Sequence, residues 1–110
     1  MTLLGRRVRG SRTGRPIMAL LDLLGRRWAL RVLWELRDAP AGFRELQARC
    51  GGMSPSVLNQ RLAELVEHRL LEADDRGAYR LTAHGRSLAA VLASLARWTD
   101  GWATALRKAR

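Results

Sequence analysis

The stretch 43–70, FRELQARCGGMSPSVLNQRLAELVEHRL, constrains the fold more than any other part of the chain. Its composition predicts a short amphipathic helix over about 43–50, followed by a glycine-rich turn at 51–53. A longer helix is then expected to open at Ser54, which is a favourable N-cap. Pro55 suits the first helical position, because an N–H there would lack an intrahelical partner.

The longer helix has an apolar face and a polar face. Leucines at i, i+4 and i+7 mark the side expected to be buried: Leu58, Leu62 and Leu65. Polar side chains near the helix start are expected to face outward: Ser56, Asn59, Gln60 and Arg61. Two helices joined by a tight turn, with exposed hydrogen-bonding groups at the start of the second, are typical of a helix-turn-helix whose second helix enters a DNA major groove.

Two more helices are expected before residue 43. Pro16 starts the first and Gly25 ends it, with an apolar face made of Ile17, Leu20, Leu21 and Leu24. The second is predicted over about 27–37, with an apolar stripe made of Trp28, Val32, Leu33 and Leu36. Proline and glycine in 38–42 then indicate a loop.

Residues 1–15 contain five arginines and no acid, which predicts a flexible basic arm. Two interpretations stay open for this arm. It is either a solvated tail, or a segment that follows DNA phosphates or enters a minor groove.

The hydrophobic period changes after the second helix of the helix-turn-helix. Residues 70–73 and 78–81 are short strand candidates, and 74–77 reads as the turn between them. A hairpin that directly follows a recognition helix is called a wing, and residues 73–78 are expected to form it. Arg76 stands at the tip, where it could meet DNA, although Asp74 and Asp75 beside it weaken that case.

A last helix is predicted over 83–109, capped by Thr82. Apolar and small residues follow a 4, 3, 4, 3, 4 spacing typical of a coiled-coil-like contact: Leu88, Leu92, Leu95, Thr99, Trp102 and Leu106. Val91 and Trp98 widen this stripe, and an identical subunit is the simplest partner to cover it. Gly101 either kinks this helix or permits close approach of a second one.

The overall composition agrees with a small basic DNA-binding domain. The chain has 110 residues, 47% of them hydrophobic, and a formal net charge of +10, so one folded domain with a polyanionic partner is expected. A single cysteine, Cys50, rules out an internal disulfide framework and favours a cytoplasmic location. Because the sequence lacks an apolar run of membrane-spanning length, no membrane partner is expected.

Several side chains allow both a functional and a structural interpretation. Cys50, beside Arg49, is either a redox switch or a packed thiol. Arg44 is either a phosphate contact or plain surface. Four tryptophans either line an effector pocket or pack in the core and the dimer: Trp28, Trp34, Trp98 and Trp102. The histidines lack metal-ligand spacing, and we expect no metal site, cofactor or catalytic site.

These residues resemble the HxlR-type (DUF24) transcriptional regulators of bacteria and archaea over about 16–98. The segment 19–28 is similar to the family's A-L-D-L-L-G-x-K-W motif, with Arg27 in place of lysine. The segments 35–46 and 54–65 resemble its E-L…G-P…F-x-E-L motif and its recognition helix. Tyr79, Leu81-Thr82 and Gly85 match its closing Y-x-L-T-x-x-G motif.

The resemblance implies a mainly α winged helix-turn-helix over 16–110, with a small β hairpin and with dimerisation helices at both ends. It implies a homodimeric regulator that binds double-stranded DNA. The residues themselves form no phosphate loop, Ser/His/Asp set or carboxylate pair, so an enzyme is not expected. DNA contacts are expected from Arg27, Arg44, Ser54, Pro55, Ser56, Asn59, Gln60, Arg61 and Arg76. The dimer interface is expected from Leu20, Leu24, Leu88, Val91, Leu92, Leu95, Trp98 and Trp102.

The sequence departs from the family pattern at three positions. Arg15 replaces a redox-sensing cysteine found in many members, so thiol sensing at that position is not expected. Arg69 stands where the recognition helix usually ends in glycine, and a left-handed conformation there would cost roughly 1 kcal/mol. Ala73 replaces a basic wing residue, which predicts fewer DNA contacts from the wing.

The favoured function is therefore an inverted-repeat DNA-binding regulator that reads its operator through helix 54–68, with an unknown small-molecule effector as a further possible partner. Two alternatives remain. One is a sequence-nonspecific, architectural nucleic-acid binder driven by the arginine arm. The other is a protein-interaction module that keeps the winged helix only as a scaffold.

Overall fold

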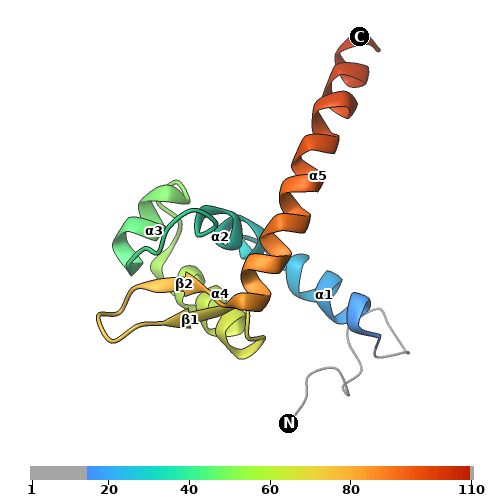
Figure 1. Cartoon of the computed structure of the whole chain (residues 1–110). Helices are drawn as coiled ribbons and strands as arrows, with labels where there is room; N and C mark the ends of the chain where they lie inside the picture. The colour runs from blue at the N-terminus through green and yellow to red at the C-terminus, as the bar shows by residue number, and fades with distance from the viewer. Residues whose placement is uncertain (1–14, 110) are drawn as a thin grey trace.

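A computed structural model describes residues 15–109, so the expected arm at 1–15 lies outside the described residues except for Arg15. The chain forms five helices and one two-stranded sheet within that range (Figure 1). In order they are α1 Pro16–Leu24, α2 Ala29–Glu35, α3 Phe43–Arg49, α4 Pro55–Glu67, β1 Leu71–Ala73, β2 Tyr79–Leu81 and α5 Ala83–Lys108. This is the expected mainly α winged helix-turn-helix.

The first two helices form where expected, but two expectations about them are wrong. The expected apolar face of α1 does not turn into the core, because Ile17 and Leu21 are more than half exposed. α1 begins at Pro16 as expected and packs inward through Ala19 and Leu23. The prediction that the second helix begins near residue 27 is wrong, because Trp28 has a φ of 77° and stands outside α2 as its N-cap. A left-handed residue cannot continue a right-handed helix.

The helix-turn-helix follows the sequence signals closely. Gly51 and Gly52 have φ values of 77° and 76°, the region that glycine enters without a steric penalty. The Ser54 side chain accepts a hydrogen bond from the Val57 backbone N–H at 3.5 Å, and so caps α4. Leu58, Leu62 and Leu65 are fully buried, which confirms the predicted stripe.

α4 ends through a left-handed residue. Arg69 has a φ of 61°, so of the two alternatives, a left-handed arginine or a helix that ends differently from the family pattern, the structure has the first. The Leu70 backbone N–H donates to the Leu65 carbonyl at 3.0 Å, and the Arg69 N–H donates to the Val66 carbonyl at 2.9 Å. These bonds form a Schellman turn, which pairs carbonyls that the helix end would otherwise leave unsatisfied.

The hairpin is antiparallel, with Leu71 opposite Leu81. Its turn is closed by the Asp74 carboxylate, which accepts hydrogen bonds from the backbone N–H groups of Arg76 and Ala78. This confirms Asp74 as a turn residue. Ala41 forms an additional bridge with Tyr79, so the expected loop at 38–42 contains a short strand contact that the sequence did not indicate.

α5 is one uninterrupted helix, and Gly101 does not divide it. Thr82 caps it by accepting a hydrogen bond from the Gly85 backbone N–H at 3.0 Å. Its first turns lie against the core, while the rest extends away from the other elements (Figure 1). None of the helices within 15–109 combines the length and the hydrophobicity that a membrane span requires.

Candidate nucleic-acid interface

The first two turns of α4 present a continuous polar surface. The expected contact residues Ser54, Pro55, Ser56, Asn59 and Gln60 are all exposed. The Ser54 and Ser56 hydroxyls lie 3.0 Å apart and share a hydrogen bond. Because the opposite side of α4 is fully buried, this surface is held on a rigid support. It offers hydroxyl and amide groups that can both donate and accept hydrogen bonds.

Arg61 does not belong to that surface, and the prediction that it faces outward is wrong. Its side chain is only 15% exposed. Its Nε donates to the Arg27 backbone carbonyl at 2.6 Å, and its guanidinium pairs with Glu64 at 2.6 Å. At about 100° per residue, Arg61 lies only about 40° from Leu65 around the helix, so it sits on the edge of the buried stripe. A helical-wheel plot of the sequence contains this signal.

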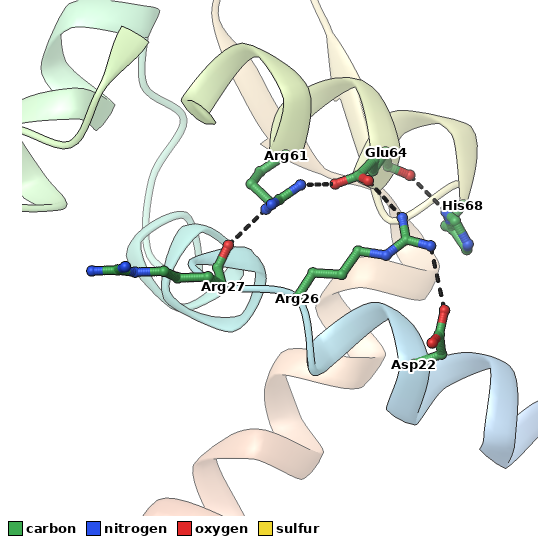
Figure 2. A network of polar contacts seen from close by, with 6 residues as sticks. All are labelled: Asp22, Arg26, Arg27, Arg61, Glu64 and His68. Atoms are coloured by element: carbon green, nitrogen blue, oxygen red, sulfur yellow. Dashed lines mark hydrogen bonds and ion pairs between the residues drawn. The ribbon is translucent and has the colours of Figure 1, made fainter. Parts of the chain in front are cut away.

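Glu64 is the centre of a polar network that sequence reasoning missed (Figure 2). One carboxylate oxygen accepts from Arg61, and the other accepts from Arg26 at 2.6 Å. Arg26 also pairs with Asp22 of α1 at 3.3 Å. The Glu64 backbone carbonyl accepts a hydrogen bond from His68 Nδ1 at 2.7 Å. The network therefore ties α4 to α1 and to the segment between α1 and α2.

The network neutralises one of the two acidic residues of α4. The sequence suggests that Glu64 and Glu67 weaken the attraction of the helix to DNA. The Glu64 charge is instead balanced by two guanidinium groups. Only Glu67 remains exposed on the helix surface.

The other expected basic contacts are exposed but widely separated in sequence. Arg27 precedes α2, Arg44 lies in the first turn of α3, and Arg76 lies at the hairpin tip. Within 15–109, none of these three side chains forms an ion pair, so their charges remain free for a phosphate. The Arg27 guanidinium lies 5.7 Å from the centroid of the Trp28 ring.

The expected dimer residues fall into two groups. Leu92 is buried, and Leu88 packs against the chain's own core, so both serve the folded chain itself. Leu20 and Leu24 of α1 are half-buried. Val91, Leu95, Trp98 and Trp102 are exposed, and the two tryptophan rings stack with their centroids 5.7 Å apart.

Cys50 is a packed core residue at the end of α3, only 1% exposed. Burial raises the pKa of its thiol, and Glu35 raises it further, while Arg31 acts in the opposite direction. The expected thiolate-favouring neighbour, Arg49, is instead paired with Glu45 at 2.7 Å. These features fit the structural interpretation, because a buried protonated thiol is unreactive. No cluster of potential metal ligands occurs in the described part of the chain.

The chain matches the family model described as HxlR-like helix-turn-helix over residues 23–107. It is 30% identical over 88 residues to the HTH-type transcriptional regulator YvaP of Bacillus subtilis, an alignment that covers 74% of this chain and 82% of YvaP. It is 31% identical over 85 residues to the HTH-type transcriptional regulator YodB of the same organism, covering 72% of this chain and 76% of YodB.

Solved structures give the same result. The crystal structure of quinone-bound YodB matches with a TM-score of 0.71 and 32% identity, covering 78% of this chain and 97% of that one. A MarR-family regulator from Enterococcus faecalis shares the fold, with a TM-score of 0.72, 23% identity, and coverage of 90% and 98% of the two chains. The chain therefore belongs to the HxlR-like helix-turn-helix family and is a DNA-binding transcriptional regulator.

Proposed function

We propose that the chain acts as a homodimer that binds an inverted-repeat operator, with α4 of each copy in a major groove and the β1–β2 hairpin beside it. The observation that carries this proposal is the polar surface on the first two turns of α4, backed by three fully buried leucines. Two such helices related by a two-fold axis would contact half-sites about 34 Å apart.

The side chains on α4 suit different contacts. Asn59 and Gln60 are the candidates for reading adenine, because each amide can donate and accept in a bidentate pair with that base. Ser54 and Ser56 lie at the helix start, where hydroxyls and backbone N–H groups favour phosphate. Arg44 and Arg76 are placed to meet phosphates from α3 and the hairpin.

Arg61 has a different role in this proposal. Its pairing with Glu64 and the Arg27 carbonyl is local and nearly buried. Contact with a base would require both interactions to break and would leave the Glu64 charge partly uncompensated. We therefore assign Arg61 to orienting α4 against the segment between α1 and α2.

The free apolar side chains of α5 support the dimer. Five large hydrophobic residues of this helix are each more than half exposed: Val91, Leu95, Trp98, Trp102 and Leu106. Exposed apolar patches of this kind mark interaction surfaces. A second copy of α5 would cover them and would bring two copies of α4 onto one duplex.

Selection of bound fragments from genomic DNA of the source organism, followed by fluorescence anisotropy at fixed salt, tests the proposal. The selected operator should contain an inverted repeat and should bind at least about 10³ times more tightly than random DNA. Asn59→Ala should weaken operator binding by about 1–3 kcal/mol. Ser87→Ala, an exposed position on α5, is the control and should leave affinity unchanged.

Two results would contradict the proposal. A ratio of operator to random affinity near one would favour a sequence-nonspecific binder. A lack of duplex binding at low salt would favour a protein-interaction module that retains the winged helix as a scaffold.

A further inference from the structure

A groove of about 860 Å³ lies between the segment that joins α1 to α2, α2 itself, and the middle of α5. Its volume is in the range of small-molecule sites, which are mostly apolar with a few polar groups. Trp28 and Trp34 line one side, and Leu92 and Leu95 line the other. Trp98 and Trp102 do not line this groove, so only two of the four tryptophans fit the effector-pocket interpretation.

The charged residues that line the groove are all arginines. Arg26, Arg27 and Arg31 line it, and no carboxylate does. Arg26 pairs with Glu64 and Asp22, and Arg31 pairs with Glu35 at 2.7 Å. Arg27 is different, because its guanidinium forms no ion pair and no hydrogen bond with the rest of 15–109. It remains available to an anion.

The backbone at Trp28 brings the indole and this guanidinium together. A φ of 77° is unusual for a bulky side chain and marks a strained backbone. In Figure 2 the Arg27 side chain points away from Arg61 and Glu64, while its carbonyl points toward them. Strained residues of this kind concentrate at ligand sites and switch regions.

We propose that this groove binds a planar aromatic carboxylate. The ring system lies against the indoles of Trp28 and Trp34 and against Leu92 of α5, and the carboxylate pairs with Arg27. Leu95 also lines the groove, but it belongs to the stripe that the second copy covers in the proposed dimer. A guanidinium and a carboxylate form paired, charge-assisted hydrogen bonds, and the apolar walls strengthen them by limiting access of water. An aromatic compound without the charge loses this pairing and leaves the Arg27 guanidinium without a counter-charge.

Ligand binding in the groove can affect the position of α4. This part of the inference rests on the proposed function, in which α4 contacts DNA. Arg27 lines the groove, and its backbone carbonyl accepts a hydrogen bond from Arg61 of α4 at 2.6 Å. A ligand that shifts residue 27 therefore shifts the acceptor that holds α4. The affinity for operator changes only to the extent that the ligand prefers one position of this segment.

Isothermal titration calorimetry of the full chain without DNA tests the site, with 2-naphthoate as probe and 2-naphthamide as an uncharged control of the same shape. We expect 2-naphthoate to bind once per chain with a Kd below about 1 mM. The amide should bind at least about tenfold more weakly, and Arg27→Gln should weaken 2-naphthoate binding by a similar factor. Arg97→Gln, an exposed arginine of α5 outside the groove, is the matched control.

An absence of binding heat up to about 5 mM 2-naphthoate would rule out the site. Equal affinities for 2-naphthoate and 2-naphthamide would also rule it out, as would equal effects of Arg27→Gln and Arg97→Gln on 2-naphthoate affinity. Loss of binding only at protein concentrations where the chain self-associates would show that a second copy fills the groove, and would also overturn the proposal.

Operator binding with and without 2-naphthoate tests the coupling separately. We expect the ligand to change operator affinity at least about threefold in the wild-type chain. Arg61→Ala should abolish this change while keeping 2-naphthoate affinity. Ligand binding without any change in operator affinity would overturn the coupling alone. A failure of the proposed operator recognition would leave the DNA-free calorimetry unaffected.

Discussion

The apolar side chains of the body of the fold are mostly buried, whereas those of the distal half of α5 are mostly exposed. In the body, Leu58, Leu62 and Leu65 of α4 are covered completely by neighbours in the same chain. In the distal half of α5, Trp98 and Trp102 are 62% and 51% exposed and their rings stack on each other. The two regions have similar helical spacing of apolar residues, yet only one of them finds its partner within the chain.

This difference separates two kinds of stability. Burial in the body is independent of protein concentration, because the neighbours belong to the same molecule. Burial of the α5 side chains, in the proposed dimer, depends on concentration through the association equilibrium. Substitutions in the two regions should therefore be distinguishable by a dilution series.

The largest effect is expected from Leu58→Ala. Removing this fully buried side chain should lower the free energy of unfolding by about 2–5 kcal/mol, through lost burial and the cavity left behind. Urea denaturation followed by circular dichroism at several protein concentrations measures it. Leu106→Ala, in the exposed stripe, is the comparison and should change dilute-chain stability by less than about 0.5 kcal/mol. Equal losses would remove the distinction between the two regions.

Trp98→Ala should act mainly on self-association. Loss of an interface tryptophan should weaken the dimer by about 2 kcal/mol, or roughly 30-fold in its dissociation constant. Sedimentation equilibrium measures this constant, and Arg97→Ala on the opposite face of α5 provides the control. A dimer that is unaffected by Trp98→Ala would place the interface elsewhere.

Arg61→Ala should lower the free energy of unfolding by about 1–3 kcal/mol, because it removes charge-assisted hydrogen bonds to Glu64 and the Arg27 carbonyl. In this variant, the slope of the logarithm of operator affinity against the logarithm of salt concentration should stay the same as in the wild-type chain. Arg44→Ala, which removes an exposed charge, should do the reverse and reduce that slope by about one. Urea denaturation and anisotropy titrations over a salt series measure the two effects. A reduced slope for Arg61→Ala would return this residue to the DNA interface.

The smallest expected effect is a gain. Arg69→Gly should stabilise the chain by about 1 kcal/mol, because glycine tolerates the φ of 61° at the end of α4. Gly77→Ala, at a φ of 83° in the hairpin turn, should lose a similar amount and serves as the opposite-sign control. Thermal denaturation measures both. Destabilisation by Arg69→Gly would mean that the arginine side chain makes a contribution larger than the backbone strain.

The parts of the fold that the sequence predicts well are those encoded by neighbouring residues. The cap at Ser54, the glycines of the turn, the leucine period of α4 and the Asp74 turn all depend on residues within about four positions of each other. Local signals of this kind survive in the folded chain because tertiary packing reinforces them.

The features that escaped prediction depend on distant contacts. The apolar period runs through Trp28 without a glycine or proline to mark the left-handed residue there. The partner of Glu64 in the other segment, Arg26, is 38 positions away, so the network could not be read from spacing. The Ala41–Tyr79 bridge joins one residue of the loop before α3 to one residue of β2. A contact between two single residues leaves no periodic pattern in the sequence.

The junction between α4 and α5 has a consequence for operator spacing. The Leu70 carbonyl accepts the Thr82 backbone N–H at 3.0 Å, and a Cβ at Gly85 would lie 2.1 Å from the same oxygen, so α5 starts in direct contact with the end of α4. In the proposed dimer, a junction this tight would fix the distance between the two copies of α4 relative to the two copies of α5. One base pair added between the half-sites shifts one half-site relative to the other by about 3.4 Å and rotates it by about 34°. Because the junction between α4 and α5 has no hinge, the proposed dimer should not adjust to this change, and it should bind the longer operator less tightly.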